Sequence, residues 1–204
     1  MSQAALTIVD TGCANIASVK FAVERLGIIA EVSDDIRVIA KSQRVILPGV
    51  GSAPAAMKSI HAKNLKDCLL NLTQPVLGVC LGMQLMVEES QECDLGKNEN
   101  TQGLGLMPGT VEKMQVGQLR LPHMGWNKVH SINSNALFDG IDDGAYFYFV
   151  HGYAVPEYEY TLAVSEYAKP FSAAINKDNF FGVQFHPERS SDAGAQLLKN
   201  FSRL

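Results

Sequence analysis

The chain has 204 residues, of which 47% are apolar and 19% charged, and its formal net charge is −4. It contains no run of basic residues and no apolar segment as long as a membrane span, so neither nucleic acid nor a membrane is expected as a partner. This composition is typical of one globular domain with a sizeable core, and we expect a single domain over residues 1–204.

The first half of the chain alternates predicted strands with predicted helices. Four short apolar runs are typical of buried strands, at residues 5–10, 28–34, 44–51 and 74–80. Helical spacing of apolar residues predicts helices at 15–27 and 52–72, and a further helix is expected over 81–90. This order favours a three-layer α/β fold with a mostly parallel central sheet and helices on both faces.

The second half is richer in aromatic residues and in β-propensity. Its predicted strands lie at 145–153, 160–168 and 171–188, and turn residues at 176–179 predict a hairpin within the last of them. Residues 192–204 predict a closing amphipathic helix. The polar segment 91–103 is expected to be the least ordered, and no repeat or linker indicates a second domain.

The cysteines and the N-terminal segment indicate the compartment. Residues 1–10 lack the basic region and long apolar run of a signal peptide. The four cysteines are too far apart for a Cys-x-x-Cys motif, and the chain is too long for a small disulfide-stapled domain. No phosphate-binding loop is present. We expect a cytoplasmic location, free thiols, and neither a metal nor a cofactor.

Cys80 lies between two glycines, where the fourth strand is expected to meet a helix. A glycine on each side allows a sharp strand–turn–helix bend that exposes the central side chain, which is the arrangement of a nucleophile elbow. A free cysteine is, however, commonly a buried structural residue. The short pattern alone leaves both interpretations open.

A cysteine nucleophile needs a base, and the chain offers five histidines. His61 lies in a polar helical stretch and His130 at an exposed strand end, whereas His186 ends an apolar run. Carboxyl ends of parallel strands meet at one edge of a sheet, so His186 and Cys80 are expected to share a crevice. Glu188 follows closely and could hold the imidazole, although it could also be an ordinary surface charge. Together with the elbow, the pattern favours a Cys-His-Glu triad.

Two further features lie near the expected crevice. Gln84 is one helical turn after Cys80 and could contact a substrate, or it could simply be exposed. The loop 48–51 ends the neighbouring strand, and its glycines would allow a peptide N–H to point into the site. The loop residues Gly49, Val50 and Gly51, together with the N–H of Leu81, would then form an oxyanion hole. A simple strand-end turn would have the same composition.

These motifs resemble those of a known family. The segments GVCLGMQ (78–84) and GVQFHPE (182–188) resemble the class I, or triad, glutamine amidotransferases, which have a flavodoxin-like fold. Three more segments narrow the resemblance to the glutaminase subunits of imidazole glycerol phosphate synthase: LPGVGSA (47–53), LPHMGWNKV (121–129) and YFYFVHGYAVP (146–156). The resemblance covers nearly the whole chain, from residue 7 to the last predicted helix.

The resemblance implies a glutamine-hydrolysing site. It assigns Cys80, His186 and Glu188 to the triad. It also implies that five residues contact bound glutamine or line its pocket: Gln84, Glu92, Tyr148, His151 and Gly152. Glu92 would meet the substrate's amino group. Gly152 stands where a serine or threonine is usual in the family, which weakens any side-chain contact there.

The resemblance also implies a partner. A cyclase subunit, a (β/α)8 barrel, would form a heterodimer with this chain, receive its ammonia, and make imidazole glycerol phosphate and aminoimidazole carboxamide ribonucleotide in histidine biosynthesis. We expect Trp126, Asn127 and Arg189 at that interface. Trp126 is expected in a loop flanked by proline and glycine, although it could instead pack in the core. Two alternatives stay open: a free-standing cysteine hydrolase of the peptidase or deglycase type, and a non-catalytic regulatory subunit.

Overall fold

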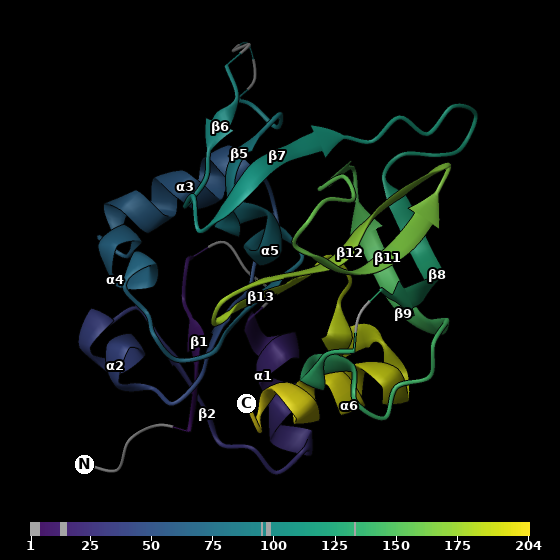
Figure 1. Ribbon diagram of the computed structural model, residues 1–204. Helices are drawn as coiled ribbons and strands as arrows, with labels where there is room; N and C mark the ends of the chain where they lie inside the picture. The colour runs from purple at the N-terminus through teal and green to yellow at the C-terminus, as the bar shows by residue number, and fades with distance from the viewer. Residues whose placement is uncertain (1–4, 13–15, 95, 97–98, 133) are drawn as a thin grey trace.

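The computed structural model describes residues 5–12, 16–94, 96, 99–132 and 134–204. A nine-stranded sheet crosses the whole molecule (Figure 1). Its strands, from one edge to the other, are β2 (Ala30–Ser33), β1 (Leu6–Val9), β3 (Val45–Leu47), β4 (Val76–Val79), β13 (Phe180–Val183), β12 (Lys169–Lys177), β11 (Thr161–Tyr167), β8 (His123–Ser131) and β9 (Ala145–His151). The first five strands are mutually parallel and the remaining pairings are antiparallel. The β-rich second half therefore continues the sheet that the first half begins.

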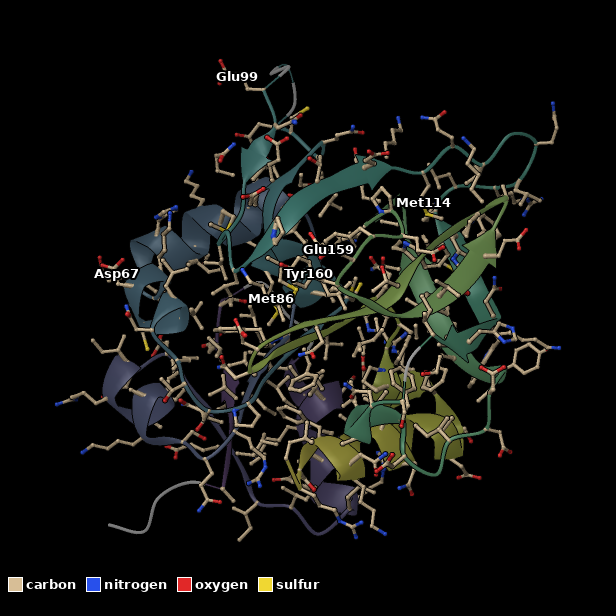
Figure 2. The ribbon with its side chains drawn as sticks, viewed as in Figure 1. Asp67, Met86, Glu99, Met114, Glu159 and Tyr160 are labelled. Carbon is tan, nitrogen blue, oxygen red and sulfur yellow. The ribbon has the colours of Figure 1, made fainter. Side chains whose placement is uncertain are left out.

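Helices cover both faces of the sheet, as expected for the three-layer α/β class. On one face, α1 (Ile16–Arg25) and the closing helix α6 (Ser191–Phe201) pack against a core that includes Phe147, Phe149 and Phe185. The other face carries α2 (Ile36–Lys41), α3 (Ala53–Ala62), α4 (Lys66–Leu70) and α5 (Leu81–Met86). Figure 2 shows Met86 inside the molecule, whereas Asp67 and Glu99 extend outward from the surface. Among the described helices, none is long and apolar enough to cross a membrane.

Several expected elements have different bounds. The single helix over 52–72 is wrong: α3 ends before Asn64, whose φ of 55° is left-handed, a conformation that asparagine tolerates better than most residues. The helix over 81–90 is also wrong beyond Met86, because Val87–Ser90 forms strand β5 and pairs with β7 (Met107–Lys113). The start of the first helix at Asn15 lies outside the described residues.

A smaller sheet lies beside the central one. Its order is β10 (Tyr153–Ala154), β7, β5 and β6 (Thr101–Gln102). The predicted strand 145–153 is therefore divided, since β9 stays in the central sheet and β10 joins the smaller one. The predicted hairpin is confirmed, with β12 and β13 paired antiparallel around Asp178 at φ 53°. Short 3-10 turns η1 (Ala136–Phe138) and η2 (Pro187–Arg189) complete the described elements.

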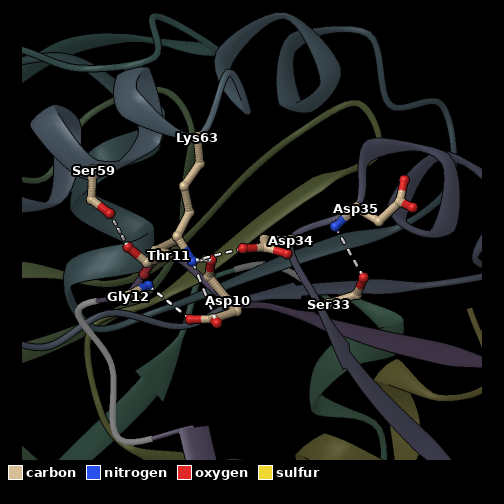
Figure 3. Close-up of polar contacts among 8 residues, drawn as sticks. All are labelled: Asp10, Thr11, Gly12, Ser33, Asp34, Asp35, Ser59 and Lys63. Atoms are coloured by element: carbon tan, nitrogen blue, oxygen red, sulfur yellow. Dashed lines mark hydrogen bonds and ion pairs between the residues drawn. The ribbon is translucent and has the colours of Figure 1, made fainter.

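The carboxyl ends of β1 and β2 are tied to the end of α3 (Figure 3). Lys63 Nζ donates to the Asp10 carbonyl oxygen at 2.9 Å and to the Asp34 carboxylate at 3.0 Å. One turn earlier, the Ser59 hydroxyl donates to the Thr11 carbonyl. The hydrogen bond from Lys63 lowers the pKa of Asp34. These contacts fix the end of α3, whose first residue, Ala53, donates its backbone N–H to Glu92.

Candidate active site

A cavity of about 270 Å³ opens at the carboxyl ends of β4 and β13. These two strands are adjacent and parallel, with Val79 opposite Val183, so the residues that follow them are brought together. Cys80, His186 and Glu188 all line this cavity. The sheet-edge argument made from the sequence therefore agrees with the geometry.

Cys80 occupies a strained turn between β4 and α5. Its φ of 53° and ψ of −110° are unusual for a residue with a side chain. A Cβ on Gly78 would lie 2.7 Å from the Met83 backbone nitrogen, and a Cβ on Gly82 would collide with the Leu47 carbonyl oxygen. Both flanking glycines are therefore required by close backbone approach, as expected for a nucleophile elbow.

His186 and Glu188 form a buried pair. Glu188 Oε1 lies 2.8 Å from His186 Nδ1, and the side chains are 7% exposed for the histidine and 4% for the glutamate. Since a carboxylate only accepts, Nδ1 carries a proton. The backbone N–H of His186 donates to the Tyr148 carbonyl at 2.9 Å, which fixes the residue against β9. His186 Nε2 is buried and has no hydrogen-bond partner among the residues that the structure describes.

The surroundings of His186 favour its charged form. Burial lowers the pKa of this imidazole, but the nearby Cys80 sulfur and the hydrogen-bonded, charged Glu188 outweigh the burial and raise the pKa to about 10. At neutral pH the ring is therefore an imidazolium. This is the state that pairs with a cysteine thiolate and can give a proton to a departing amine.

The loop after β3 lies directly beside the elbow. Val50 and Gly51 line the cavity together with Leu81. Gly49, which was expected to form part of the same wall, is not among the lining residues. A Cβ on Gly49 would lie 2.8 Å from both the Gly82 nitrogen and the Leu81 Cβ, so this glycine packs the loop against the start of α5 instead.

Gln84 and Glu92 contribute polar groups to the same cavity. Gln84 is buried rather than exposed, and both protons of its amide are used, one on the Tyr153 carbonyl and one on Gln184 Oε1, each at 2.9 Å. Its own carbonyl oxygen is the group left for a ligand. Glu92 accepts the Ala53 N–H at 2.7 Å, at the start of α3, and burial raises the pKa of this carboxyl.

His151 lines the cavity as part of a buried histidine pair. Its Nδ1 lies 2.9 Å from the Tyr153 carbonyl oxygen, which only accepts, and its Nε2 lies 3.0 Å from His123 Nδ1. Burial lowers the pKa of His151 to about 3, so the ring is neutral and Nε2 accepts a hydrogen bond from His123 Nδ1–H. His123 was one of the five histidines that the sequence offered as a base, but it does not line the cavity: it is 1% exposed, and its ring stacks on that of Tyr167 with 4.1 Å between the ring centroids.

Of two further residues expected in the pocket, Gly152 lines the cavity and Tyr148 does not. Tyr148 is not among the residues that line the cavity; its carbonyl holds His186, and its ring contacts Trp126 edge to face at 6.1 Å. Gly152 does line the cavity, and a Cβ there would meet only the Leu121 side chain, at 3.8 Å. The position therefore has room for a Cβ.

The residues expected at an interface lie on or near one exposed face. Trp126 is on strand β8, not in a loop, and it is 49% exposed, so the core-packing alternative is wrong. Met124, two residues earlier on the same face, is 64% exposed. Asn127 is held by a hydrogen bond from its Nδ2 to the Glu166 carbonyl at 2.7 Å. Arg189 is exposed at the rim of the cavity.

Comparisons with known proteins agree with this geometry. The family described as "Glutamine amidotransferase class-I" matches residues 7–203. The imidazole glycerol phosphate synthase subunit HisH of Colwellia psychrerythraea is 53% identical, covering 100% of this chain and 95% of that protein. The HisH subunit of Vibrio cholerae is 51% identical, covering 98% of each chain.

Solved structures show the same fold at low sequence identity. A crystal structure of a glutamine amidotransferase superposes with a TM-score of 0.72 at 16% identity, covering 98% of this chain and 100% of the other. The structure of PurLQS from Thermotoga maritima gives 0.69 at 18% identity, covering 96% of each chain. On the family match and the full-length relatives, the chain belongs to the class I glutamine amidotransferases, in the group of imidazole glycerol phosphate synthase subunits HisH.

Proposed function

We propose that this chain hydrolyses glutamine to glutamate and ammonia, and that it supplies the ammonia to a cyclase subunit of imidazole glycerol phosphate synthase. One observation carries the proposal: Cys80 at a strained elbow shares a cavity with the His186–Glu188 pair. The full-length relatives, named as subunits of that synthase, support the choice of pathway.

The chemistry is acyl transfer to sulfur. The Cys80 thiolate attacks the side-chain amide carbon of glutamine, and the carbonyl oxygen becomes an oxyanion. Backbone N–H groups of Leu81 and of the Val50–Gly51 loop stabilise that oxyanion. The His186 imidazolium protonates the nitrogen as the C–N bond breaks, so ammonia leaves and a γ-glutamyl thioester forms. His186, now neutral, takes a proton from water, whose attack on the thioester releases glutamate and the thiolate.

Substrate recognition uses the remaining polar wall of the cavity. The Glu92 carboxylate pairs with the ammonium group of glutamine, and the free carbonyl oxygen of Gln84 accepts a hydrogen bond from the substrate. His151 and Gly152 line the same wall. Because His151 is neutral and held at both ring nitrogens, it shapes the pocket without competing with His186 for protons.

The partner would dock on the exposed face of β8 and β9. Three apolar or aromatic side chains are about half exposed or more on this face: Trp126, Met124 and Tyr146. Arg189 lies at the rim of the cavity. Ammonia is useful to a cyclase only while neutral, so a tightly docked (β/α)8 barrel that receives it away from bulk water fits the chemistry. We propose a one-to-one heterodimer in the cytoplasm, with residues 1–204 forming one domain.

Substitution of Cys80 by alanine tests the proposal. In the complex, Cys80→Ala should abolish glutamine-dependent product formation and leave ammonium-dependent formation intact, because the cyclase needs only ammonia. Loss of both activities would give Cys80 a structural role instead. Glutamine hydrolysis that the cyclase does not stimulate would favour a free-standing hydrolase, and a chain that neither hydrolyses glutamine nor reacts at Cys80 would favour a regulatory subunit.

A further inference from the structure

A buried amide that the proposed mechanism does not use lies against the nucleophile. Gln184 directly follows β13 and is completely buried. One end of its side chain lies 3.8 Å from Cys80 Sγ, and the other end lies 2.9 Å from the Gln84 side chain. A buried amide needs partners at both ends, so its orientation decides what it presents to the sulfur.

The direction of this amide follows from a single backbone carbonyl. The Tyr153 oxygen can only accept, so the Gln84 atom at 2.9 Å from it is the amide nitrogen. That same nitrogen lies 2.9 Å from Gln184, whose facing atom must therefore be the carbonyl oxygen. The nitrogen of Gln184 is left to face Cys80 Sγ. The opposite orientation would place two N–H donors against each other and would turn a carbonyl oxygen toward the sulfur.

An N–H donor interacts more strongly with a thiolate than with a thiol, because the hydrogen bond is then charge-assisted. The sulfur is an anion before it attacks glutamine and again when it leaves the thioester. The titratable residues that line the cavity with it are His186 and Glu188, and, on the other walls, His151, Glu92, Tyr153 and Arg189. Of these, His186 provides the neighbouring positive charge, and Gln184 provides an uncharged donor from the buried side.

We propose that Gln184 is a further catalytic residue, whose side-chain N–H donates to Cys80 Sγ and stabilises the thiolate. This inference rests on the proposed function only in taking Cys80 as the nucleophile.

The test measures the nucleophile directly, without glutamine. Alkylation of Cys80 by iodoacetamide is followed across pH by mass spectrometry of its peptide, in the full chain and in Gln184→Met. The variant keeps the side-chain volume and loses the donor. The pH at which alkylation reaches half its plateau rate should rise by about one unit, a tenfold smaller thiolate fraction below that pH. Gln184→Asn, whose shorter side chain does not reach the sulfur, should show the same shift.

The matched control lies at the other end of the same strand. Asn179, just before β13, donates through Nδ2 to the Leu72 and Gln74 carbonyls, so Asn179→Leu removes two hydrogen bonds of a half-buried amide far from the cavity. Its alkylation profile should equal that of the unmodified chain. A Gln184→Met profile with an unchanged midpoint, or with only a lower plateau, overturns the proposal.

A second measurement keeps the proposal testable if neither Gln184 variant folds. In the chain without substitutions, alkylation of Cys80 removes the thiolate that accepts the hydrogen bond from Gln184. The resonance of one side-chain amide proton of Gln184 should therefore move upfield in the NMR spectrum. An unmoved signal overturns the proposal. Because neither measurement involves glutamine hydrolysis, a failed glutaminase assay and a failed shift are separate results.

Discussion

Replacing Glu188 by glutamine separates the charge of the triad acid from its shape. Glu188 Oε1 accepts the proton of His186 Nδ1 at 2.8 Å, and the glutamate side chain is only 4% exposed, so solvent cannot take over its role. A glutamine at this position can offer its nitrogen to Nδ1, which forces the proton onto Nε2. In that tautomer, the nitrogen that faces Cys80 cannot accept a proton from it.

The expected loss of kcat has two causes, the changed tautomer of His186 and a lower pKa of its ring. The charge of Glu188 is one of the causes that raise the pKa of His186 to about 10, and burial opposes them. Without that charge the pKa of His186 falls, so the imidazolium that pairs with the thiolate is less stable. Removing the acid of a triad typically reduces kcat by roughly 10⁴-fold, and we expect a loss of about 10³–10⁴ here.

The assay is glutamine-dependent turnover in the complex, with ammonium-dependent turnover as the measure of folding and docking. Asp192→Asn is the matched control, because it makes the same change at an exposed acid in the first turn of α6. It should stay near the unmodified rate, and Glu188→Gln should lose kcat while keeping ammonium-dependent activity. A kcat for Glu188→Gln within tenfold of the unmodified chain would remove Glu188 from the mechanism.

Two further substitutions test the pocket and the docking face. Glu92→Gln removes the charge expected to hold the substrate ammonium, so the KM for glutamine should rise roughly 10- to 100-fold with a smaller change in kcat, measured by steady-state kinetics; an unchanged KM would place the ammonium elsewhere. Trp126→Ala should raise the Kd for the cyclase at least about tenfold by calorimetry, whereas Ile29→Ala, at an 83% exposed residue next to β2, should leave it unchanged. Equal affinities for the two variants would contradict docking on β8.

The strand that carries Trp126 shows why part of the fold escaped prediction. Pro122 and Gly125 indicated a loop, since both residues commonly interrupt regular structure. The segment is a strand because it pairs with β9 from His123 opposite His151 to Val129 opposite Ala145. Such pairing depends on a partner about twenty residues away, which local propensity does not report. The pairing of His123 with His151 was not predicted for the same reason.

The meeting of Cys80, His186 and Glu188 in one cavity was predictable because their positions depend on topology. Cys80 and His186 each follow a buried strand, and the carboxyl ends of parallel neighbours meet at one edge whatever the detailed packing. Gln184 had no comparable signal, because it follows β13 in a bend, where strand alternation does not tell which way a side chain points. Its contact with Cys80 Sγ is visible only in the structure.

The partners that orient these side chains are mostly backbone carbonyls, and a sequence does not show where a carbonyl points. Tyr148 was expected in the pocket through its side chain, yet it acts through its carbonyl, which receives the His186 N–H. The Tyr153 carbonyl accepts hydrogen bonds from both Gln84 and His151. It therefore fixes the direction of the Gln84 amide and the tautomer of the His151 ring. A substitution at Tyr153 that preserves the backbone should therefore leave both orientations in place, whereas a shift of the β10 backbone would release Gln84 and His151 together.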